Sequence, residues 1–169
     1  NVPVKGVNPF DEWRMQDTFP KEENRSVEKY MFNSGNCAIS KSVWEKFHFD
    51  ERIPFAEDRL WAKAVLENGF KIKYLPAASA FHSHWFSQAQ LFNRMRWQGF
   101  AVKAIYGNSC RYDGISWMSF AYVYFVSRDI LYFVINGYFK FLPRIFVYRF
   151  IHLKGLYCGA KAYVRNEKI

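Results

Sequence analysis

The stretch PFAEDRLWAKAVLENGFKIKYLP (54–76) decides the fold class that the sequence predicts. Its first part carries apolar residues at helical spacing and closes on Gly69, which is typical of a helix that ends before a glycine. Its second part, FKIKYLP, alternates apolar residues with lysines, the pattern of a β-strand with one solvent-facing side. A helix followed directly by such a strand indicates α/β architecture.

Neighbouring segments continue this alternation of strand and helix. The segment YMFNSGNCAIS (30–40) predicts a loop that leads into a buried strand, and KSVWEKF (41–47) predicts a short helix capped by Ser40. The segment ASAFHSH (78–84) predicts a second short extended segment that ends in two histidines. We therefore expect an α/β fold in which short strands alternate with helices.

The two ends of the chain have a different composition. Residues 1–30 are polar and contain three prolines, which predicts a loop with room for one short helix. A capping box formed by Ser87 and Gln90 opens a helix that we expect to run to Gly99 or somewhat beyond. From Ile115 the sequence is mostly apolar and aromatic with scattered basic residues, and there we expect two or three helices.

The positive charge of the chain is concentrated in its later part. The 169 residues carry a formal net charge of +9, and 21% of them are aromatic. Residues 1–100 hold 14 basic and 12 acidic residues, whereas residues 101–169 hold 10 and 3. Lysine and arginine meet anionic lipid headgroups, while aromatic rings settle at the membrane interface. We therefore expect residues 115–169 to bind an anionic membrane surface.

This basic tail is better suited to lie on a bilayer than to cross it. Its longest stretch without charge, Ile115–Ser127, is shorter than the roughly 20 residues that a spanning helix needs. Arg128 and Asp129 interrupt any longer window, so we expect an interfacial helical hairpin. A nucleic-acid partner is disfavoured, because the basic residues alternate with long apolar faces and no RNP, KH or zinc-finger pattern occurs.

The cysteines and the first residues bear on the cellular context. Cys37, Cys110 and Cys158 are far apart and match no zinc-binding spacing, which indicates a reducing compartment. No segment has the order of a signal peptide. The chain begins without methionine, and we expect it to be the later portion of a longer protein.

Two adjacent carboxylates, Glu57 and Asp58, occupy the first turn of the predicted helix. Unpaired N–H groups and the helix macrodipole favour negative charge there, so helix capping alone can explain them. Alternatively, a carboxylate could take a proton from a sugar hydroxyl while the indole of Trp61, one turn further on, stacks on the sugar ring. Local sequence leaves both interpretations open.

Histidines and arginines supply the other candidate site residues. His82 and His84 project to one side of an extended segment, as two metal ligands would, although either can equally be structural. With no cysteine or third histidine nearby, the pair suits a hard cation such as Mg²⁺ or Mn²⁺ shared with a diphosphate. Arg94 and Arg96 lie on different faces of a helix, and one of them can hold phosphate oxygens, although either can equally be solvated or packed. No P-loop, Rossmann glycine motif or Ser-His-Asp order occurs.

Read in order, NSGNCAISKSVWEKFHFDERIPFAEDRLWAKAVLENGFKIKYLPAASAFHSH (33–84) closely resembles the second half of a family 2 inverting glycosyltransferase with the GT-A fold. It is most similar to bacterial rhamnosyltransferase-like enzymes of cell-wall and surface polysaccharide synthesis. The resemblance implies the acceptor-binding half of a GT-A catalytic domain at residues 1–110. It implies a helical membrane-associating tail at 111–169, on the inner, cytoplasmic face of the cell membrane.

The resemblance also implies a role for each matching residue. Asp58 would be the general base that deprotonates the acceptor hydroxyl, and Glu57 would orient the acceptor or the base. Trp61 would line the acceptor subsite. Asn36 would lie near the donor sugar, with Gly35 allowing close approach of the backbone.

Further roles concern the diphosphate side of the implied site. His82 would be a ligand of the divalent cation, Mg²⁺ or Mn²⁺, and His84 would support it or contact phosphate. Arg96, in NRMRW (93–97), would contribute to substrate binding. Asn93 replaces the glutamine of the QxxRW motif of processive relatives, so processivity is not implied.

The implied reaction transfers a sugar, such as rhamnose, from a nucleotide-sugar donor to a saccharide or lipid-linked acceptor by one inverting displacement. The sequence departs from the family because it lacks the DxD motif that holds the metal. The N-terminal, nucleotide-binding half is therefore expected elsewhere, and these residues alone should be inactive. The alternative function is a non-catalytic peripheral membrane-binding module.

Overall fold

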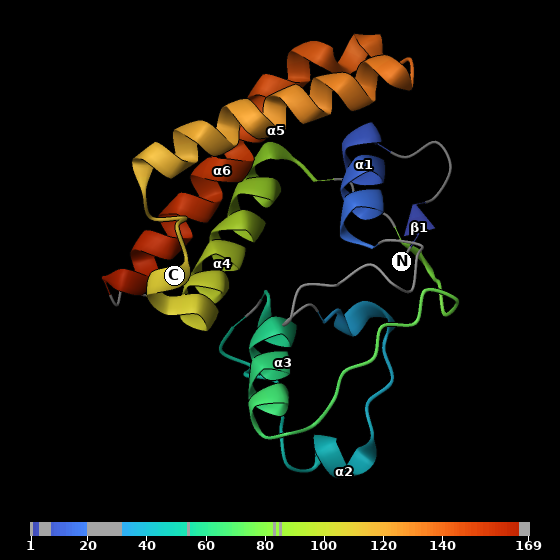
Figure 1. Cartoon of the computed structure of the whole chain (residues 1–169), viewed down its shortest axis with the longest axis vertical. Helices are drawn as coiled ribbons and strands as arrows, with labels where there is room; N and C mark the ends of the chain where they lie inside the picture. Colours follow the sequence, from blue (N-terminus) through green and yellow to red (C-terminus); the bar gives the residue numbers. More distant parts are fainter. Residues whose placement is uncertain are drawn as a thin grey trace. The chain divides into compact units, whose positions relative to one another are not determined.

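The computed structural model describes residues 2–3, 8–19, 32–53, 55–82, 84 and 86–165. Contacts divide the chain into two compact units, Asn1–Trp85 and Phe86–Ile169, which run from blue to green and from green to red in Figure 1. Helices account for most of the described residues, and each of the two strands has only two residues. The charged run predicted to be loop at 21–24 lies outside the described residues.

The expected α/β, GT-A-like fold is wrong for the part of the chain that the structure describes. Strand β1 (Val2–Pro3) pairs in parallel with β2 (Phe81–His82), and the described ranges contain no other strand. Residues 70–75 do alternate between half-buried and exposed, as FKIKYL predicts, but they join no ladder. The segment 37–40, expected to be a buried strand, is mostly exposed. Alternation indicates which side of a segment is wet, whereas a strand also requires a partner backbone.

Local capping signals account for the helices of the first unit. These are α1 (Pro9–Thr18), the 3₁₀ turn η1 (Ser34–Asn36), α2 (Lys41–Trp44) and α3 (Glu57–Glu67). Asn8 caps α1 by accepting a hydrogen bond from Phe10 N at 3.1 Å, with Pro9 at the first helical position. Ser40 caps α2 as predicted, since its Oγ accepts from Val43 N at 3.3 Å.

Helix α3 supplies much of the core of the first unit. Its buried residues are Trp61, Ala62 and Val65. The Trp61 ring lies 4.9 Å from that of Phe32, and its Nε1 donates a hydrogen bond to Phe47 O at 2.8 Å. Gly69 follows the helix with φ of 84°, which confirms the predicted helix end.

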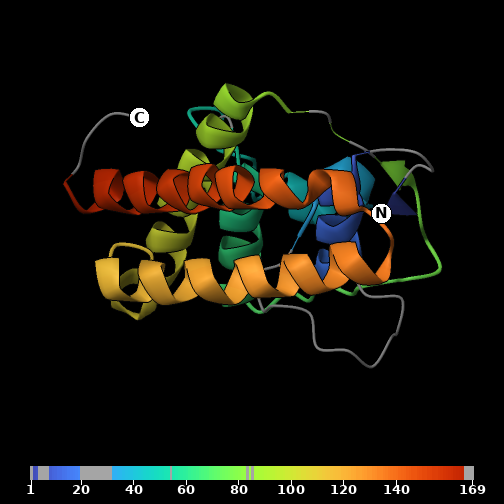
Figure 2. The same cartoon turned by 90° about the horizontal axis from the view of Figure 1, so that it is seen from above.

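The second unit is built from three long helices. They are α4 (Gln88–Tyr106), α5 (Ile115–Ile135) and α6 (Leu142–Val164), joined through the short turns η2 (Gly107–Ser109) and η3 (Phe139–Phe141). The predicted capping box of Ser87 and Gln90 opens α4. Helices α5 and α6 run side by side in opposite directions (Figures 1 and 2), which confirms the predicted helical hairpin. Its interfacial position stays a prediction.

Glycines allow α4 and α6 to form the most extensive helix contact of the described chain. A Cβ built at Gly155 would lie 2.6 Å from Met95 Cβ, and one built at Gly99 would lie 2.8 Å from Leu156 Cα. The two backbones can approach this closely only because these side chains are absent. This contact joins α4 to the tail, and the two compact units divide after Trp85. The expected functional division into residues 1–110 and 111–169 stays a prediction.

Two ion pairs lie in the interior of the second unit. Asp129 of α5 is fully buried and accepts two hydrogen bonds from Arg149 of α6, at 2.5 and 2.7 Å. Lys103 of α4, also buried, lies 3.1 Å from Asp113 Oδ2 and donates to Cys110 O at 3.4 Å. A buried charge is tolerated when it is paired and hydrogen-bonded in this way.

Candidate functional site

The turn η1 brings together residues that are far apart in the sequence. Ser34 N donates a hydrogen bond to Asp58 Oδ2 at 3.2 Å, across 24 residues. A Cβ built at Gly35 would lie 3.9 Å from Cε1 of His82. The turn Ser34–Asn36 therefore adjoins both the first turn of α3 and strand β2. Three segments that the sequence singled out meet at this point.

Asp58 is held by two backbone donors of different kinds. Its Oδ1 accepts a hydrogen bond from Arg59 N at 2.8 Å, a local contact that satisfies an N–H of the first helical turn. Its Oδ2 accepts the long-range bond from Ser34. Helix capping and attachment to η1 are thus both present at Asp58. Glu57, which precedes it, is half-buried, and its predicted role in orienting the acceptor stays a prediction.

The backbone immediately before these carboxylates is strained. Ala56 has φ of 64° and ψ of 18°, and no other non-glycine residue of the described chain has a positive φ. The left-handed conformation costs an L-residue roughly 1–2 kcal/mol. Such strain persists where the surrounding structure imposes it, and it is concentrated at functional sites. Ala56 also offers no side-chain cap, so Asp58 takes over part of that task.

His82 and His84 converge, as the sequence predicts. Their Nε2 atoms are 2.6 Å apart, so one ring donates a hydrogen bond to the other. The rings meet edge to face with centroids 4.3 Å apart. The backbone N–H of His84 donates to Asp11 Oδ2 at 2.7 Å, and Asp11 Oδ1 accepts from Arg14 at 2.6 Å. The buried carboxylate of Asp11 therefore anchors the histidine segment to α1.

The described residues do not fit a complete divalent-cation site. No group of three or more His, Cys, Asp or Glu side chains placed to share an ion is found in the described ranges. The two imidazoles are bonded to each other, and Asp11 is engaged by His84 and Arg14. Mg²⁺ requires near-octahedral oxygen ligands, which this pair does not supply. The role of His82 as a cation ligand stays a prediction.

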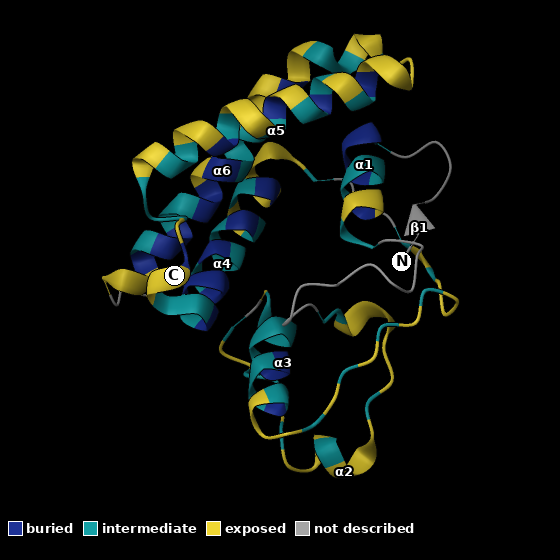
Figure 3. Cartoon of the chain, viewed as in Figure 1, coloured by how far each residue is buried: buried dark blue, intermediate teal, exposed yellow. Residues whose placement is uncertain are grey.

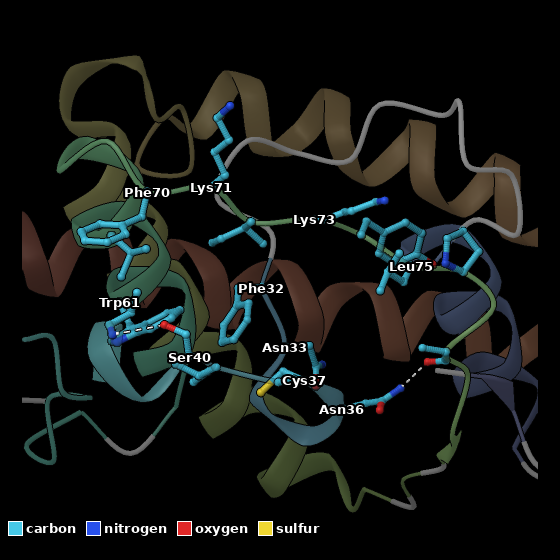
Figure 4. A pocket seen from close by; sticks show the side chains of 18 of the residues that line it. Phe32, Asn33, Asn36, Cys37, Ser40, Trp61, Phe70, Lys71, Lys73 and Leu75 are labelled. Carbon is cyan, nitrogen blue, oxygen red and sulfur yellow. Dashed lines mark hydrogen bonds between the residues drawn. The ribbon is translucent and has the colours of Figure 1, made fainter. Parts of the chain in front are cut away.

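A cavity of about 620 Å³ opens beside η1 in the first unit. Figure 4 shows its aromatic side, formed by Phe32 and Trp61, and its polar side, where Asn33 and Asn36 project from the turn. Asn36 Nδ2 donates to Ala78 O at 2.9 Å, which fixes that side chain at the cavity rim. Aromatic surface combined with a few fixed polar groups is typical of small-ligand pockets of this size.

The structure places the two other predicted substrate-binding residues, Trp61 and Arg96, in different units. Trp61 lines the cavity but is only 6% exposed, because its ring packs on Phe32 and its N–H is bonded to Phe47. Its packing alone explains its burial, so its contact with an acceptor stays a prediction. Arg96 belongs to the second unit, where its backbone lies against Gly159 of α6. Its substrate role also stays a prediction.

Sequence reasoning missed two residues of this site. Asp11 follows an Asn-Pro helix start that is recognisable, but nothing in the sequence connects it with His84, 73 residues away. Cys37 lies at the end of η1, where burial first, and then the negative charge of Asp58, raise the pKa of its thiol.

Comparison with known proteins identifies no relative. No family model matches the chain, and neither a curated protein nor a solved structure matches it.

Proposed function

We propose that the first unit forms the acceptor side of an inverting glycosyl-transfer site, with Asp58 as general base. The observation that carries this proposal is the hydrogen bond from Ser34 N to Asp58 Oδ2. It attaches the carboxylate to the turn that contains Gly35 and Asn36 and that adjoins His82. The resemblance assigns site roles to all four residues, and this supports treating them as one site.

Asp58 is suited to remove one proton in a defined direction. Two backbone N–H groups fix its carboxylate, which lowers the entropic cost of aligning it with an acceptor hydroxyl. In the proposed step an Asp58 oxygen takes the hydroxyl proton as the acceptor oxygen bonds to the anomeric carbon. The bond from that carbon to the diphosphate oxygen breaks, the nucleoside diphosphate leaves with the electron pair, and configuration inverts.

The cavity beside η1 provides room for a sugar-sized acceptor, although Asp58 and Glu57 are not among the residues that line it. Its volume of about 620 Å³ falls in the range of small-molecule sites. Asn33 and Asn36 offer amide groups for hydroxyl contacts, and Phe32 offers an aromatic face. Glu57 would orient the acceptor from the first turn of α3. The transferred sugar, with rhamnose as the first candidate, and the acceptor, a saccharide or a lipid-linked saccharide, follow from the resemblance alone.

The donor nucleotide is proposed to bind to residues outside this sequence, because the chain contains no P-loop and no DxD motif. A divalent cation would supply charge neutralisation to the leaving diphosphate. The described residues do not complete its ligand set, so the step above relies on Asp58 alone. Three free thiols support a reducing, cytoplasmic location on the inner side of the membrane.

The test compares two Asp→Asn variants of the chain in its natural protein context. Asp58→Asn preserves the shape of the side chain and can accept one of the two backbone hydrogen bonds that Asp58 accepts, from Ser34 or from Arg59, but it is no base. We expect transfer from a panel of nucleotide sugars to fall roughly 10²- to 10⁴-fold. Asp50→Asn is the control, because Asp50 lies on the surface and is paired with Arg52. Transfer retained by Asp58→Asn would refute the assignment of the base.

The alternative is a non-catalytic membrane-binding module in which Asp58 only caps α3, a role that its local bond from Arg59 N already fulfils. If Asp58 only caps α3, Asp58→Ala lowers stability by about 1 kcal/mol, and saccharides have no specific site beside it. Saturation-transfer NMR of the chain with rhamnosides and other saccharides separates the two functions. A signal that disappears when Asn36 is replaced by alanine supports the acceptor site.

A further inference from the structure

The residues of α5 that are exposed carry no charge over the whole length of the helix. The half-buried Arg128 lies over the ring of Tyr124, 5.5 Å from its centroid. Ten residues of α5 are exposed, of which seven are apolar or aromatic and three are serines. Phe120 is 69% exposed, Leu131 is 62% exposed and Ile135 is 72% exposed. Figure 3 shows the exposed colour recurring along α5 from end to end. A helix of 21 residues is about 32 Å long, so this is an extended apolar strip.

The neighbouring helix and turn add aromatic and basic residues to this strip. In α6, Phe146 and Val147 are exposed, and so is Phe150 one helical turn further on. Its exposed charged residues, Arg144 and Lys154, are both basic. In η3, Phe139 and Lys140 are exposed as well. We call α5, η3 and the exposed side of α6 the hairpin face.

Basic residues greatly outnumber acidic ones in the second unit. Residues 1–85 carry 12 basic and 12 acidic residues, whereas residues 86–169 carry 12 and 3, so the second unit holds the whole net charge of +9. Its two described carboxylates, Asp113 and Asp129, are each engaged in an ion pair with Lys103 or Arg149. The charge presented to solvent by the described part of this unit is therefore positive.

We infer that the hairpin face docks on an anionic lipid bilayer, with α5 lying in the interface plane. The uncharged strip would enter the boundary between headgroups and acyl chains, and the flanking lysines and arginines would meet lipid phosphates. An acidic protein partner would need matching charges, but the exposed residues of the strip offer it none, and Arg128 beside them is half-buried over Tyr124. A bilayer surface matches both the apolar strip and its basic border. This inference is independent of the proposed glycosyl transfer.

The cations at the start of α6 support an anionic partner. Lys140 precedes the helix and Arg144 lies in its first turn, where the described sequence has no acidic residue. The positive end of a helix macrodipole disfavours cations. A lipid phosphate bound at the start of α6 would neutralise the positive charge of both side chains and of the helix N-terminus.

The contacts of α5 argue for docking and against crossing. Of the described helices, α5 alone is long and apolar enough to span a bilayer by length and composition. Its fully buried Asp129, however, is paired with Arg149 of α6, so a spanning α5 would draw α6 into the bilayer with it. Helix α6 also carries Arg144, Lys154 and Lys161, each costly in hydrocarbon.

Vesicle flotation of the 169-residue chain tests the inference. We expect the chain to float with mixed phosphatidylcholine–phosphatidylglycerol vesicles and only weakly with phosphatidylcholine alone. Raising the salt concentration to about 1 M shortens the screening length to about 3 Å and should reduce binding at least roughly tenfold. Failure to float with the mixed vesicles would overturn the inference.

Matched variants locate the surface. Phe120→Ser/Leu131→Ser should reduce partition into the mixed vesicles roughly tenfold or more, because both side chains would be buried in the interface. The control Leu75→Ser/Phe81→Ser also removes an exposed leucine and phenylalanine, but from the first unit, and should bind as the wild type does. Since all four side chains are exposed, circular dichroism should show every variant folded. Equal losses in both double variants would contradict the assignment.

Three further measurements test the charge dependence and distinguish a spanning helix and a second copy of the chain from an interfacial position. Lys140→Gln/Arg144→Gln should weaken binding to the mixed vesicles roughly tenfold or more and leave the weak binding to phosphatidylcholine unchanged. Resistance of the bound chain to alkaline carbonate would indicate a spanning helix and overturn the interfacial position. A lipid-free dimer that Phe120→Ser/Leu131→Ser dissociates would assign the face to a second copy of the chain.

Discussion

Gly159 of α6 lies directly against the backbone of Arg96 of α4. A Cβ at position 159 would be 2.7 Å from the carbonyl carbon of Arg96 and 2.8 Å from Phe100 N. These are backbone atoms, which cannot rotate away as a side chain would. The second unit therefore depends on a residue without a side chain at this crossing, although the sequence presents Gly159 in an ordinary helical stretch.

Gly159→Ala is expected to destabilise the second unit by about 1–3 kcal/mol, the usual cost of overpacking an interior contact. Urea denaturation followed by far-ultraviolet circular dichroism measures the change. The control is Gly114→Ala, where the new Cβ would lie 3.4 Å from Arg111 O, an ordinary contact at φ of −96°. If the two variants are equally stable, α4 and α6 can move apart to accept the new methyl group without a cost in the free energy of unfolding.

Removing one member of the Asp129–Arg149 pair should lower the free energy of unfolding much more than replacing both members. Asp129→Leu leaves the guanidinium of Arg149, whose side chain is 12% exposed, without its carboxylate. We expect a loss of about 3–5 kcal/mol in the free energy of unfolding. Asp129→Leu/Arg149→Met removes both charges and should recover most of that loss.

An exposed pair provides the comparison for that cycle. Glu45→Gln removes the partner of Lys41 in a pair 3.9 Å apart whose side chains are 88% and 61% exposed. Solvent screens such a pair, so we expect little change in stability. If the double variant at 129 and 149 is as unstable as the single variant, the loss of stability comes from the altered shape of the side chains and not from an unpaired buried charge.

The sequence predicted those features whose causes are local. The Ser40 cap, the capping box of Ser87 and Gln90, and the end of α3 before Gly69 each depend on residues within one helical turn, and all three are confirmed. The strands failed for the opposite reason. The alternation in 70–75 correctly predicted exposure, but strand formation depends on a second backbone that no local pattern reveals.

The candidate site was only partly visible in the sequence for similar reasons. The resemblance placed Asp58, Gly35 and His82 in one site, and the structure brings all three to η1. The anchoring of His84 by Asp11 across 73 residues had no sequence signal. Gly155 and Gly159 are four residues apart, yet small residues at this spacing acquire meaning only when the facing helix is known.

Relief of strain at Ala56 should raise stability. Its φ of 64° is easy for glycine and costly for alanine, so Ala56→Gly is expected to stabilise the first unit by up to about 1 kcal/mol. Ala64→Gly, in the middle of the same helix, should instead lose about 1 kcal/mol. Thermal unfolding of the two variants measures these opposite signs. Destabilisation by both would show that position 56 is not strained.

The thiol of Cys37 reports the position of Asp58 without any need for an activity assay. Burial first, and then the charge of Asp58, raise the pKa of this thiol above its usual value. A raised pKa leaves less thiolate at a given pH, so iodoacetamide should alkylate Cys37 more slowly at pH 8 than it alkylates an unperturbed thiol. Asp58→Asn removes the second cause and should accelerate the reaction at the same pH.

Peptide mass spectrometry over a pH series follows Cys37 and Cys110 in the same sample. The pKa of Cys110 is raised chiefly by burial in the other unit, so its rate should not respond to Asp58→Asn. Asparagine can accept the bond from Ser34 N through its one amide oxygen, at the expense of the bond from Arg59 N. Circular dichroism of the variant therefore accompanies the alkylation rates. An unchanged Cys37 rate would mean that the charge of Asp58 does not act on this thiol. It would contradict the close approach of the carboxylate to η1 on which the proposed role of Asp58 depends.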